Sequence, residues 1–415
     1  MYLSDLHIHS RYSYATSRDL CPETLDLWAR KKGIDLLGTG DFTHPAWRQE
    51  LKDKLVPAEE GLYTLRNDLR LPDPAPQNSN LPRFVISGEI SSIYKKNGRT
   101  RKVHSLILLP GLKEADSLSA KLEQKGNISS DGRPILNLDC HDLLAMTLEV
   151  CPEAIFIPAH IWTPHFSLLG ERSGFDTVEE CFEELTPYIR ALETGLSSDP
   201  AMNRQVRALD RFHLVSNSDA HSPSRLGREA TLLAGPLSYQ GLYEAVQLGN
   251  GLAGTIEFFP EEGKYHYDGH RSCGVCLSPS QAEKAKGLCP VCGKKLTPGV
   301  LHRIMDLAGE GFSLPEPSSI QPPYQCLAPL PELISAIQGT ACPGVRAMRA
   351  YEHALMELGN EFYILRNAPE ADIAHVLGPE TASGIRRLRA GMVRWQPGFD
   401  GVYGSMELFE GRQDV

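Results

Sequence analysis

The chain has 415 residues, of which 41% are hydrophobic and 23% are charged, and its formal net charge is −10. This composition is typical of a globular protein, and the length predicts two or three domains. The acidic balance does not indicate a general nucleic-acid binder, no apolar run reaches membrane-spanning length, and the start lacks a signal-peptide pattern. We therefore expect a cytoplasmic protein.

Short apolar segments alternate with amphipathic stretches through the first part of the chain. After the opening segment DLHIHS, strands are expected within 36–42, 83–90, 102–109, 153–160, 189–195 and 212–221. Residues 22–33 have apolar side chains at helical spacing, and Gly33 marks the expected helix end. This alternation predicts an α/β fold with a parallel sheet, either closed as a β/α barrel or doubly wound.

Residues that can bind metals follow the ends of these strands. His7 and His9 are two positions apart, so on a strand both imidazoles point to one face. Most other candidates stand at the carboxyl ends of later strands, where β/α barrels form their active sites: Asp41, Glu89, His160, Glu193, Asp219 and His221. The full set is His7, His9, Asp41, His44, Glu89, His104, His160, His165, Glu193, Asp219 and His221.

The chemistry of this set predicts a multi-metal hydrolase. Mixed imidazole and carboxylate ligands suit zinc, manganese or iron, and the set is larger than one ion needs. Two or more neighbouring ions can activate water and clamp a phosphate, and the sequence has neither a GxSxG elbow nor a Walker loop. For His44 and His165 a structural role is as well supported as a ligand role.

The order of the motifs HIHS, TGD, GE, VH, PAH and SDAH resembles the polymerase and histidinol phosphatase (PHP) family. The resemblance implies a distorted, seven-stranded β/α barrel with a two- or three-metal phosphoesterase site. It implies a first ion bound by His7, His9, Glu89 and Asp219, a second bound by Glu89, His104 and His160, and a third site with Asp41 and His221.

Two positions depart from the usual pattern of that family. Ala15 stands where many members have another histidine, and Asp41 stands where a histidine is common. Occupancy of the third site is therefore left open, and Asp41 is alternatively a general base. The candidate catalytic residues are Asp41, Glu89 and Asp219.

Two CxxC pairs, CGVC (273–276) and CPVC (289–292), are separated by twelve residues. This spacing predicts a closed structural zinc site with the ligands Cys273, Cys276, Cys289 and Cys292. Residues 263–303 contain seven basic and two acidic residues. Their lysines, Lys284, Lys286, Lys294 and Lys295, either follow a phosphate backbone or form a solvated face.

The last hundred residues contain a second basic and aromatic segment, RRLRAGMVRWQPGFDGVYG (386–404). It fits phosphate contacts with base stacking, and it equally fits an amphipathic helix followed by a small hairpin. Pro-rich joins are expected at 71–82 and 312–325. We expect a barrel over 1–262, the zinc finger over 263–303, and a mainly helical DNA-recognition region over 304–415.

Longer motifs make the chain similar to the endonuclease Q family over about residues 1–410. These are GTGDFTHP, PAHIWTPHFS, ETGLSSDPAMN, SNSDAHSPSRLGREA, the two cysteine pairs, PPYQCLAPLPELI and PGFDGVYG. The resemblance implies a DNA repair endonuclease that cuts 5′ to deaminated bases (hypoxanthine, uracil, xanthine) and abasic sites. It implies that the damaged nucleotide is flipped out of double- or single-stranded DNA.

The same resemblance sets the expected cofactors. Zinc is expected in the finger and the barrel, with magnesium or manganese as alternatives that support activity. From the basic and aromatic segments described above, DNA contacts are expected at Lys294, Lys295, Arg386, Arg387, Arg389, Trp395 and Tyr403. Side chains near Trp162, His165 and Phe166 are candidates for a base pocket because the motif PAHIWTPHF contains a metal-ligand candidate. Whether the protein has a sliding clamp or a helicase as a partner is left open. The alternative functions are a small-molecule phosphatase, a 3′–5′ exonuclease, and a non-catalytic helicase-associated DNA-binding factor.

Overall fold

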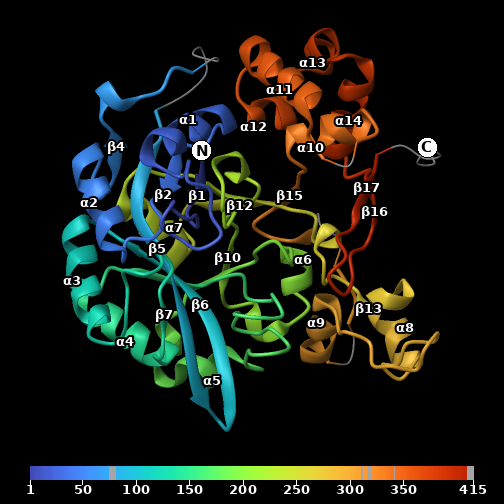
Figure 1. Ribbon diagram of the computed structural model, residues 1–415, viewed down its shortest axis with the longest axis horizontal. Coiled ribbons are helices and arrows are strands. Elements are labelled where there is room, and N and C mark those ends of the chain that lie inside the picture. Colours follow the sequence, from blue (N-terminus) through green and yellow to red (C-terminus); the bar gives the residue numbers. More distant parts are fainter. Residues whose placement is uncertain (74–80, 310–311, 316–318, 341, 409–415) are drawn as a thin grey trace.

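The computed structural model describes residues 1–73, 81–309, 312–315, 319–340 and 342–408 (Figure 1). Each predicted strand segment contains an observed strand, and the fold is mixed α/β. These strands are β1 (Tyr2–Asp5), β2 (Leu36–Gly38), β5 (Arg83–Lys96), β6 (Arg99–Leu109), β8 (Ile155–Pro158), β9 (Ala191–Glu193) and β10 (His213–Val215).

Strand β1 lies inside the main sheet because both of its edges are paired. It pairs in parallel with β2 and antiparallel with β11 (Ala230–Leu233). Within the described residues this sheet contains 11 strands, and its main path runs β15-β12-β11-β1-β2-β5-β4-β3. The remaining members are β3 (Leu55–Pro57), β4 (Tyr63–Leu65), β7 (Ile135–Leu136), β12 (Leu252–Glu257) and β15 (Tyr324–Cys326).

The sheet is not the parallel sheet that the sequence predicted. Strands β5 and β6 form a long antiparallel hairpin, and β6 pairs antiparallel with β8. The hairpin turns at Asn97 and Gly98, whose φ angles of 53° and 73° suit an Asn-Gly turn. Strands β9 and β10 form a separate parallel pair, so the strand ladders of the described residues do not close. The closed seven-stranded barrel stays a prediction.

Helices follow most of the strands and cover them. The predicted first helix is α1 (Pro22–Lys32), which ends where Gly33 adopts φ 89° and donates its N–H to the Ala29 carbonyl. Figure 1 shows α2, α3 and α4 on the outside of the strands. Leu118 and Leu143 from α3 and α4 pack with Ile107 of β6 in one core. These and the next helices are α2 (Pro45–Lys54), α3 (Leu112–Glu123), α4 (Cys140–Val150), α5 (Val178–Phe182), α6 (Pro200–Asn203) and α7 (Tyr239–Leu248).

The second part of the chain contains a small finger and a helical group. The finger consists of β13 (Asp268–His270), β14 (Val275–Leu277) and α8 (Pro279–Lys284) and is followed by α9 (Val300–Ala308). The helical group is α10 (Leu330–Ile337), α11 (Val345–Leu358), α12 (Glu361–Arg366), α13 (Glu370–Leu377) and α14 (Pro379–Arg389), and it agrees with the mainly helical expectation. Residues 74–80 and 316–318 of the two predicted Pro-rich joins lie outside the described residues.

These parts share contacts. Leu3 and Ile8 lie in the same hydrophobic core as Leu333 and Ile385 of the C-terminal helices. The predicted tail hairpin, β16 (Arg394–Gln396) with β17 (Ser405–Glu407), runs between that helical group and the finger (Figure 1). The expected division at residues 262 and 303 stays a prediction. Among the described residues, no helix is both long and apolar enough to cross a membrane.

Candidate metal centre

The segments after β1 and β10 lie side by side, which brings distant ligand candidates together. His7 and His9 follow β1 directly, and both side chains are fully buried. Ile8 forms a parallel bridge with Ala220, and the His9 N–H donates to the Ala220 carbonyl at 3.1 Å. As a result, Asp219 lies against the two imidazoles.

His7, His9, Glu89 and Asp219 form the first group of ligand atoms. His9 Nε2 lies 3.0 Å from Asp219 Oδ1 and 3.3 Å from Glu89 Oε2. His7 Nε2 lies 3.6 Å from the same Glu89 oxygen. This nitrogen is buried and has no hydrogen-bond partner among the described residues. A buried nitrogen that faces two carboxylates without a hydrogen bond fits a metal ligand.

The second group shares Glu89 with the first. Glu89 Oε1 lies 2.6 Å from His104 Nδ1 and 3.1 Å from His160 Nε2. The two imidazole nitrogens are 3.2 Å apart, and all three side chains are buried. Glu89 therefore presents one oxygen to each group. This is the arrangement that a carboxylate bridging two ions requires, and it agrees with the ligand sets implied by the PHP resemblance.

The charges of these side chains suit cations. Burial raises the pKa of Glu89, but His104, His7 and Arg133 outweigh it and hold that pKa well below its usual range. Burial lowers the pKa of His104 to about 4, so its imidazole is neutral and keeps a lone pair for a metal. The donor set is mixed imidazole and carboxylate, which fits zinc, manganese or iron.

Two further carboxylates orient the histidines from behind. Glu193 Oε2 lies 3.0 Å from His7 Nδ1 and accepts the His160 backbone N–H at 2.8 Å. Its other oxygen accepts a hydrogen bond from Asn217 Nδ2 at 2.8 Å. Asp41 Oδ1 lies 3.1 Å from His9 Nδ1. An Nδ1–H that donates to a carboxylate leaves Nε2 free for a metal and fixes the orientation of the ring.

The structure surrounds the Asp41 carboxylate with hydrogen-bond donors. Its Oδ2 accepts hydrogen bonds from the Ser10 N–H, Ser10 Oγ and Ser13 Oγ at 2.6, 2.6 and 2.9 Å. Burial raises the pKa of Asp41, but the charge of His9 and these bonds lower it overall. These contacts let Asp41 orient the His9 ring. The expected roles of Asp41 as a metal ligand or general base stay predictions.

Asp41 and His221 do not share a ligand group in the described part of the chain. His221 Nδ1 lies 2.8 Å from the Asp219 carbonyl oxygen, and its ring lies tilted against that of His9 with centroids 4.6 Å apart. The backbone around the site is strained, because Asp41, His160 and Asp219 have positive φ angles of 50°, 30° and 48°. The implied third site is thus not gathered by these two side chains.

The remaining histidine and aromatic candidates have varied surroundings. His44 caps α2, because its Nδ1 accepts the Trp47 N–H, and its Nε2 lies 3.0 Å from the Ser129 carbonyl oxygen. Trp162 is buried and donates to Asn203 Oδ1, as a core residue does. His165 is exposed, and the Phe166 ring lies 4.9 Å from that of His104. Of these side chains, Phe166 is the one whose ring lies against a histidine of the metal groups.

Sequence reasoning missed Arg133. Its guanidinium Nη1 lies 3.2 Å from Glu89 Oε2, and its side chain is 23% exposed. It comes from the loop before β7, and Gly132 beside it leaves no room for a Cβ against Asp41. No motif marks an isolated arginine in a loop, so only its position reveals it.

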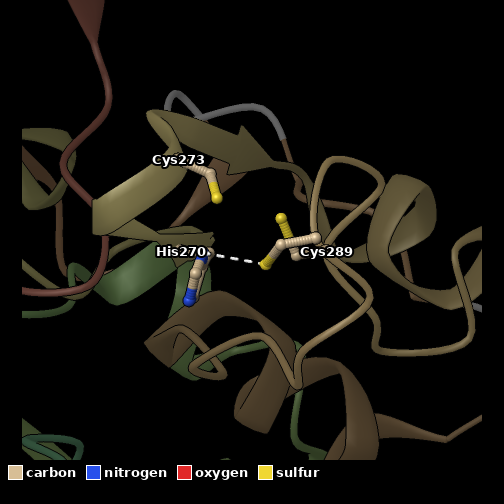
Figure 2. Close-up of side chains that lie close together, drawn as sticks. His270, Cys273 and Cys289 are labelled. Carbon is tan, nitrogen blue, oxygen red and sulfur yellow. Dashed lines mark hydrogen bonds between the residues drawn. The ribbon is translucent and has the colours of Figure 1, made fainter.

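The cysteine cluster differs from the predicted set at one position. Cys273, Cys289 and Cys292 lie with His270 in one group whose ligand atoms are all within 4.8 Å of one another. Figure 2 shows the side chains of His270, Cys273 and Cys289 pointing toward one another, and the dashed line marks His270 Nδ1 and Cys292 Sγ, 3.7 Å apart. Cys276 Sγ lies instead 3.7 Å from the Pro397 carbonyl oxygen.

The expected DNA contacts fall into two kinds. Lys294, Lys295 and Arg386 are exposed, and Tyr403 is 67% exposed. Arg389 donates to the carbonyls at the end of α12, and Trp395 packs on Phe259 with ring centroids 5.0 Å apart. The exposed residues are available to a ligand, whereas Arg389 and Trp395 pack the tail against the rest of the protein. Arg387 is half-buried.

Comparison with solved structures identifies the family. The crystal structure of the lesion-specific endonuclease PfuEndoQ from Pyrococcus furiosus matches with a TM-score of 0.83 and 30% identity, covering 99% of this chain and 96% of that one. The chain belongs to the endonuclease Q family. A second endonuclease Q structure, complexed with a 27-mer duplex that has an abasic lesion at the active site, matches with a TM-score of 0.82, 30% identity, and coverage of 99% and 97%.

Two curated relatives extend this comparison. The uncharacterized protein YqxK of Bacillus subtilis is 27% identical over 97% of this chain and 98% of its own length. An uncharacterized protein of Methanocaldococcus jannaschii is 28% identical over 66% of this chain, which spans only 36% of that longer protein. No family model matches the chain. The endonuclease Q match therefore rests on the whole fold rather than on one motif.

Proposed function

We propose that this endonuclease Q family member is a DNA repair nuclease that hydrolyses the phosphodiester 5′ to a damaged nucleotide. The observation that carries the proposal is the pair of ligand groups joined through Glu89. They lie in a chain that matches endonuclease Q over almost its full length, including the complex with abasic DNA. We further propose that deaminated bases are substrates as well as abasic sites, and that the damaged nucleotide is flipped out of the helix before the cut.

The residues present define how the site would work. His7, His9, Glu89 and Asp219 would hold one divalent ion, and His104 and His160 with Glu89 a second. Bound ions of this kind supply positive charge for a phosphate and lower the pKa of water. Glu193 and Asp41 keep the imidazoles oriented, as described above. Zinc fits these ligands, with manganese or magnesium as the alternatives that support activity.

Arg133 has the position of a phosphate-binding residue. Its guanidinium reaches the shared Glu89 from the partly exposed side of the site. A phosphate could replace Glu89 at one N–H group of Arg133 or bind another N–H group of the same guanidinium. In either case it would receive a charge-assisted hydrogen bond. We assign Arg133 to the scissile phosphate. The exposed Lys294, Lys295, Arg386 and Tyr403 support the further assignment of the finger and tail to the DNA outside the cut site.

A strand-resolved nicking assay tests the proposal. The purified protein is incubated with manganese or magnesium and with 5′-labelled duplexes that contain one abasic site, deoxyuridine, deoxyinosine or no lesion. We expect one cut 5′ to the lesion, which is lost in Asp219→Ala and retained in Glu149→Ala, whose carboxylate is 71% exposed. Laddering from a DNA end would identify an exonuclease. Hydrolysis of a small phosphomonoester without DNA cutting would identify a phosphatase. The absence of both reactions would indicate the non-catalytic DNA-binding factor.

A further inference from the structure

Tyr14 is an aromatic side chain that the fold leaves in solvent beside the metal centre. It is 79% exposed, although a tyrosine ring is a large apolar surface that folding normally covers. Tyr14 directly follows Ser13, whose buried Oγ lies 3.3 Å from His9 Nδ1 and 2.9 Å from Asp41 Oδ2. Because consecutive Cα atoms are about 3.8 Å apart, Tyr14 stands at the rim of the first ligand group.

The loop that carries this tyrosine is fixed on both sides. Thr16 Oγ1 donates to the Ser13 carbonyl at 2.7 Å. The Ser17 N–H donates to the His221 carbonyl at 2.9 Å. Ala15 has a φ of 63°, a left-handed conformation that is unfavourable for a residue with a Cβ. Strain of this kind gathers at active sites and ligand clamps, where the backbone holds a side chain in one position. The ring is therefore presented by a fixed loop.

One carboxylate joins Tyr14 to Arg133. Asp131 Oδ1 accepts the backbone N–H of Tyr14 and that of Arg133, each at 3.1 Å. The Gly132 N–H also donates to the Tyr12 carbonyl, at 2.9 Å. The two loops are thus neighbours in space although they are far apart in the sequence. A DNA strand whose phosphate contacts Arg133 would pass beside the Tyr14 ring.

The exposure of Tyr14 separates two uses of an aromatic ring. A ring that lines a pocket for a flipped base is covered by the opposite wall of that pocket, whereas a ring that is 79% exposed projects from the surface. Flipping a nucleotide leaves a gap between the two bases that flanked it. DNA-binding proteins insert protruding apolar side chains between bases, and an aromatic ring stacks on any base because every base has a π face.

We propose that Tyr14 enters the base stack of the bound duplex and fills the position that the damaged nucleotide leaves. The inference rests on the proposed function, because the gap arises only when a nucleotide leaves the stack. The gap is the same whether the extruded nucleotide carries uracil, hypoxanthine or no base. Tyr14 therefore supports cutting at every lesion without reading its identity, and its hydroxyl group is not required because the ring alone stacks.

Nicking of duplex and single-stranded oligonucleotides with deoxyuridine or an abasic site tests this role. We expect Tyr14→Ala to lower kcat/KM by about 5- to 150-fold on both duplexes, which is the value of one aromatic–base stack. On single strands, which have no opposite strand to hold the gap open, the loss should stay below about twofold, as should every loss in Tyr14→Phe. The control is Tyr188→Ala, because Tyr188 is 54% exposed and precedes β9 at the end opposite to Glu193.

Three results of this assay would overturn the inference. The first is an unchanged kcat/KM for Tyr14→Ala on both duplexes. The second is a loss on the deoxyuridine duplex without a loss on the abasic duplex, which would assign the ring to the flipped base. The third is an equal loss on duplex and single-stranded DNA, which would assign the ring to general strand binding.

Permanganate oxidation of thymines gives a second readout that does not depend on cutting. Thymines flank the lesion, and all proteins carry Asp219→Ala so that the DNA stays intact. A thymine stacked on the ring is protected, whereas a thymine that faces an empty gap is oxidised. We expect more oxidation of the flanking thymines with Tyr14→Ala than with Tyr14→Phe or Tyr188→Ala. Equal oxidation by proteins that bind at the lesion would overturn the role of Tyr14 alone, and failure of every protein to bind at the lesion would overturn the proposed function with it.

Discussion

Replacing Glu193 by glutamine tests whether the carboxylates behind the histidines control the metal centre. Glu193 has two oxygens, and each accepts a different N–H: Oε2 that of the His160 backbone and Oε1 that of Asn217. A glutamine has one acceptor oxygen and one NH₂ group. In either orientation the NH₂ group would face a donor, so one buried hydrogen bond is lost, and the orientation of His7 is weakened as well.

The magnitude follows from that count. A buried donor left without a partner costs about 1–3 kcal/mol. If this free energy appears entirely as weaker metal binding, the metal affinity falls by about 5- to 150-fold. That interval contains the 10- to 100-fold loss that is usual when a group behind a metal ligand is changed. We therefore expect the manganese concentration for half-maximal nicking to rise by about tenfold or more in Glu193→Gln.

The assay is nicking of an abasic-site duplex over a manganese titration, with the thermal unfolding midpoint measured in parallel. Glu149→Gln is the matched control, because it is the same substitution at a 71% exposed carboxylate. The reasoning would be refuted if Glu193→Gln stayed within about twofold of wild type at limiting manganese while remaining folded. It would also be refuted if saturating zinc or manganese restored no nicking activity to Glu193→Gln and if, in the double variant, the loss from His7→Ala added in full to the loss from Glu193→Gln. Glu193 and His7 are expected to act as one unit, so their separate losses should not add.

Three more outcomes are expected. Arg133→Ala lowers kcat/KM for nicking by roughly 100-fold, as the loss of a hydrogen-bond donor to developing charge does, and Arg133→Lys keeps part of the activity. Equal rates for both variants and the wild type would show that Arg133 does not bind the scissile phosphate. Gly132→Ala lowers nicking because its Cβ would collide with the Asp41 carboxylate, whereas Gly344→Ala, which meets no atom within 4 Å, does not. Burial raises the pKa of Glu257 from 4.5 to about 8. Because the folded-state value lies above the unfolded one, the wild type loses stability as pH rises from about 4.5 to 8, and Glu257→Gln should lose less over this interval in urea unfolding measured at pH 5 and pH 8.

The ligand groups were predictable because they come from the ends of strands that the apolar pattern revealed. His7, Glu89 and Asp219 each follow or lie in such a strand, and their order matched a known family. The mixed strand directions were missed, although Asn97-Gly98 between two apolar runs is itself a hairpin signal. A local turn of this kind outweighed the general rule that alternating strands and helices give a parallel sheet.

Other features could not be found from sequence because they depend on three-dimensional packing. Asp41 follows a strand as a metal ligand would, and only the folded structure shows that the hydroxyls of Ser10 and Ser13 donate to one of its two oxygens. Arg133 reaches Glu89 from a loop distant in sequence. His270 was overlooked because CGVC offers a closer match to a zinc motif, and only the folded structure groups His270 with Cys273, Cys289 and Cys292.

The core that joins Leu3 and Ile8 to Leu333 and Ile385 has a consequence for how the protein is made. The first strand leaves the ribosome long before its partners in β11 and in the C-terminal helices have been synthesised. Until then its apolar side chains can pack only on the early members of this core, such as Leu25 and Leu37. Apolar surface that waits for late partners is where chaperones bind and chains aggregate. His7 and His9, which follow this strand, therefore reach their final positions late in biosynthesis, and a nascent chain that ends before Asp219 would lack the first ligand group.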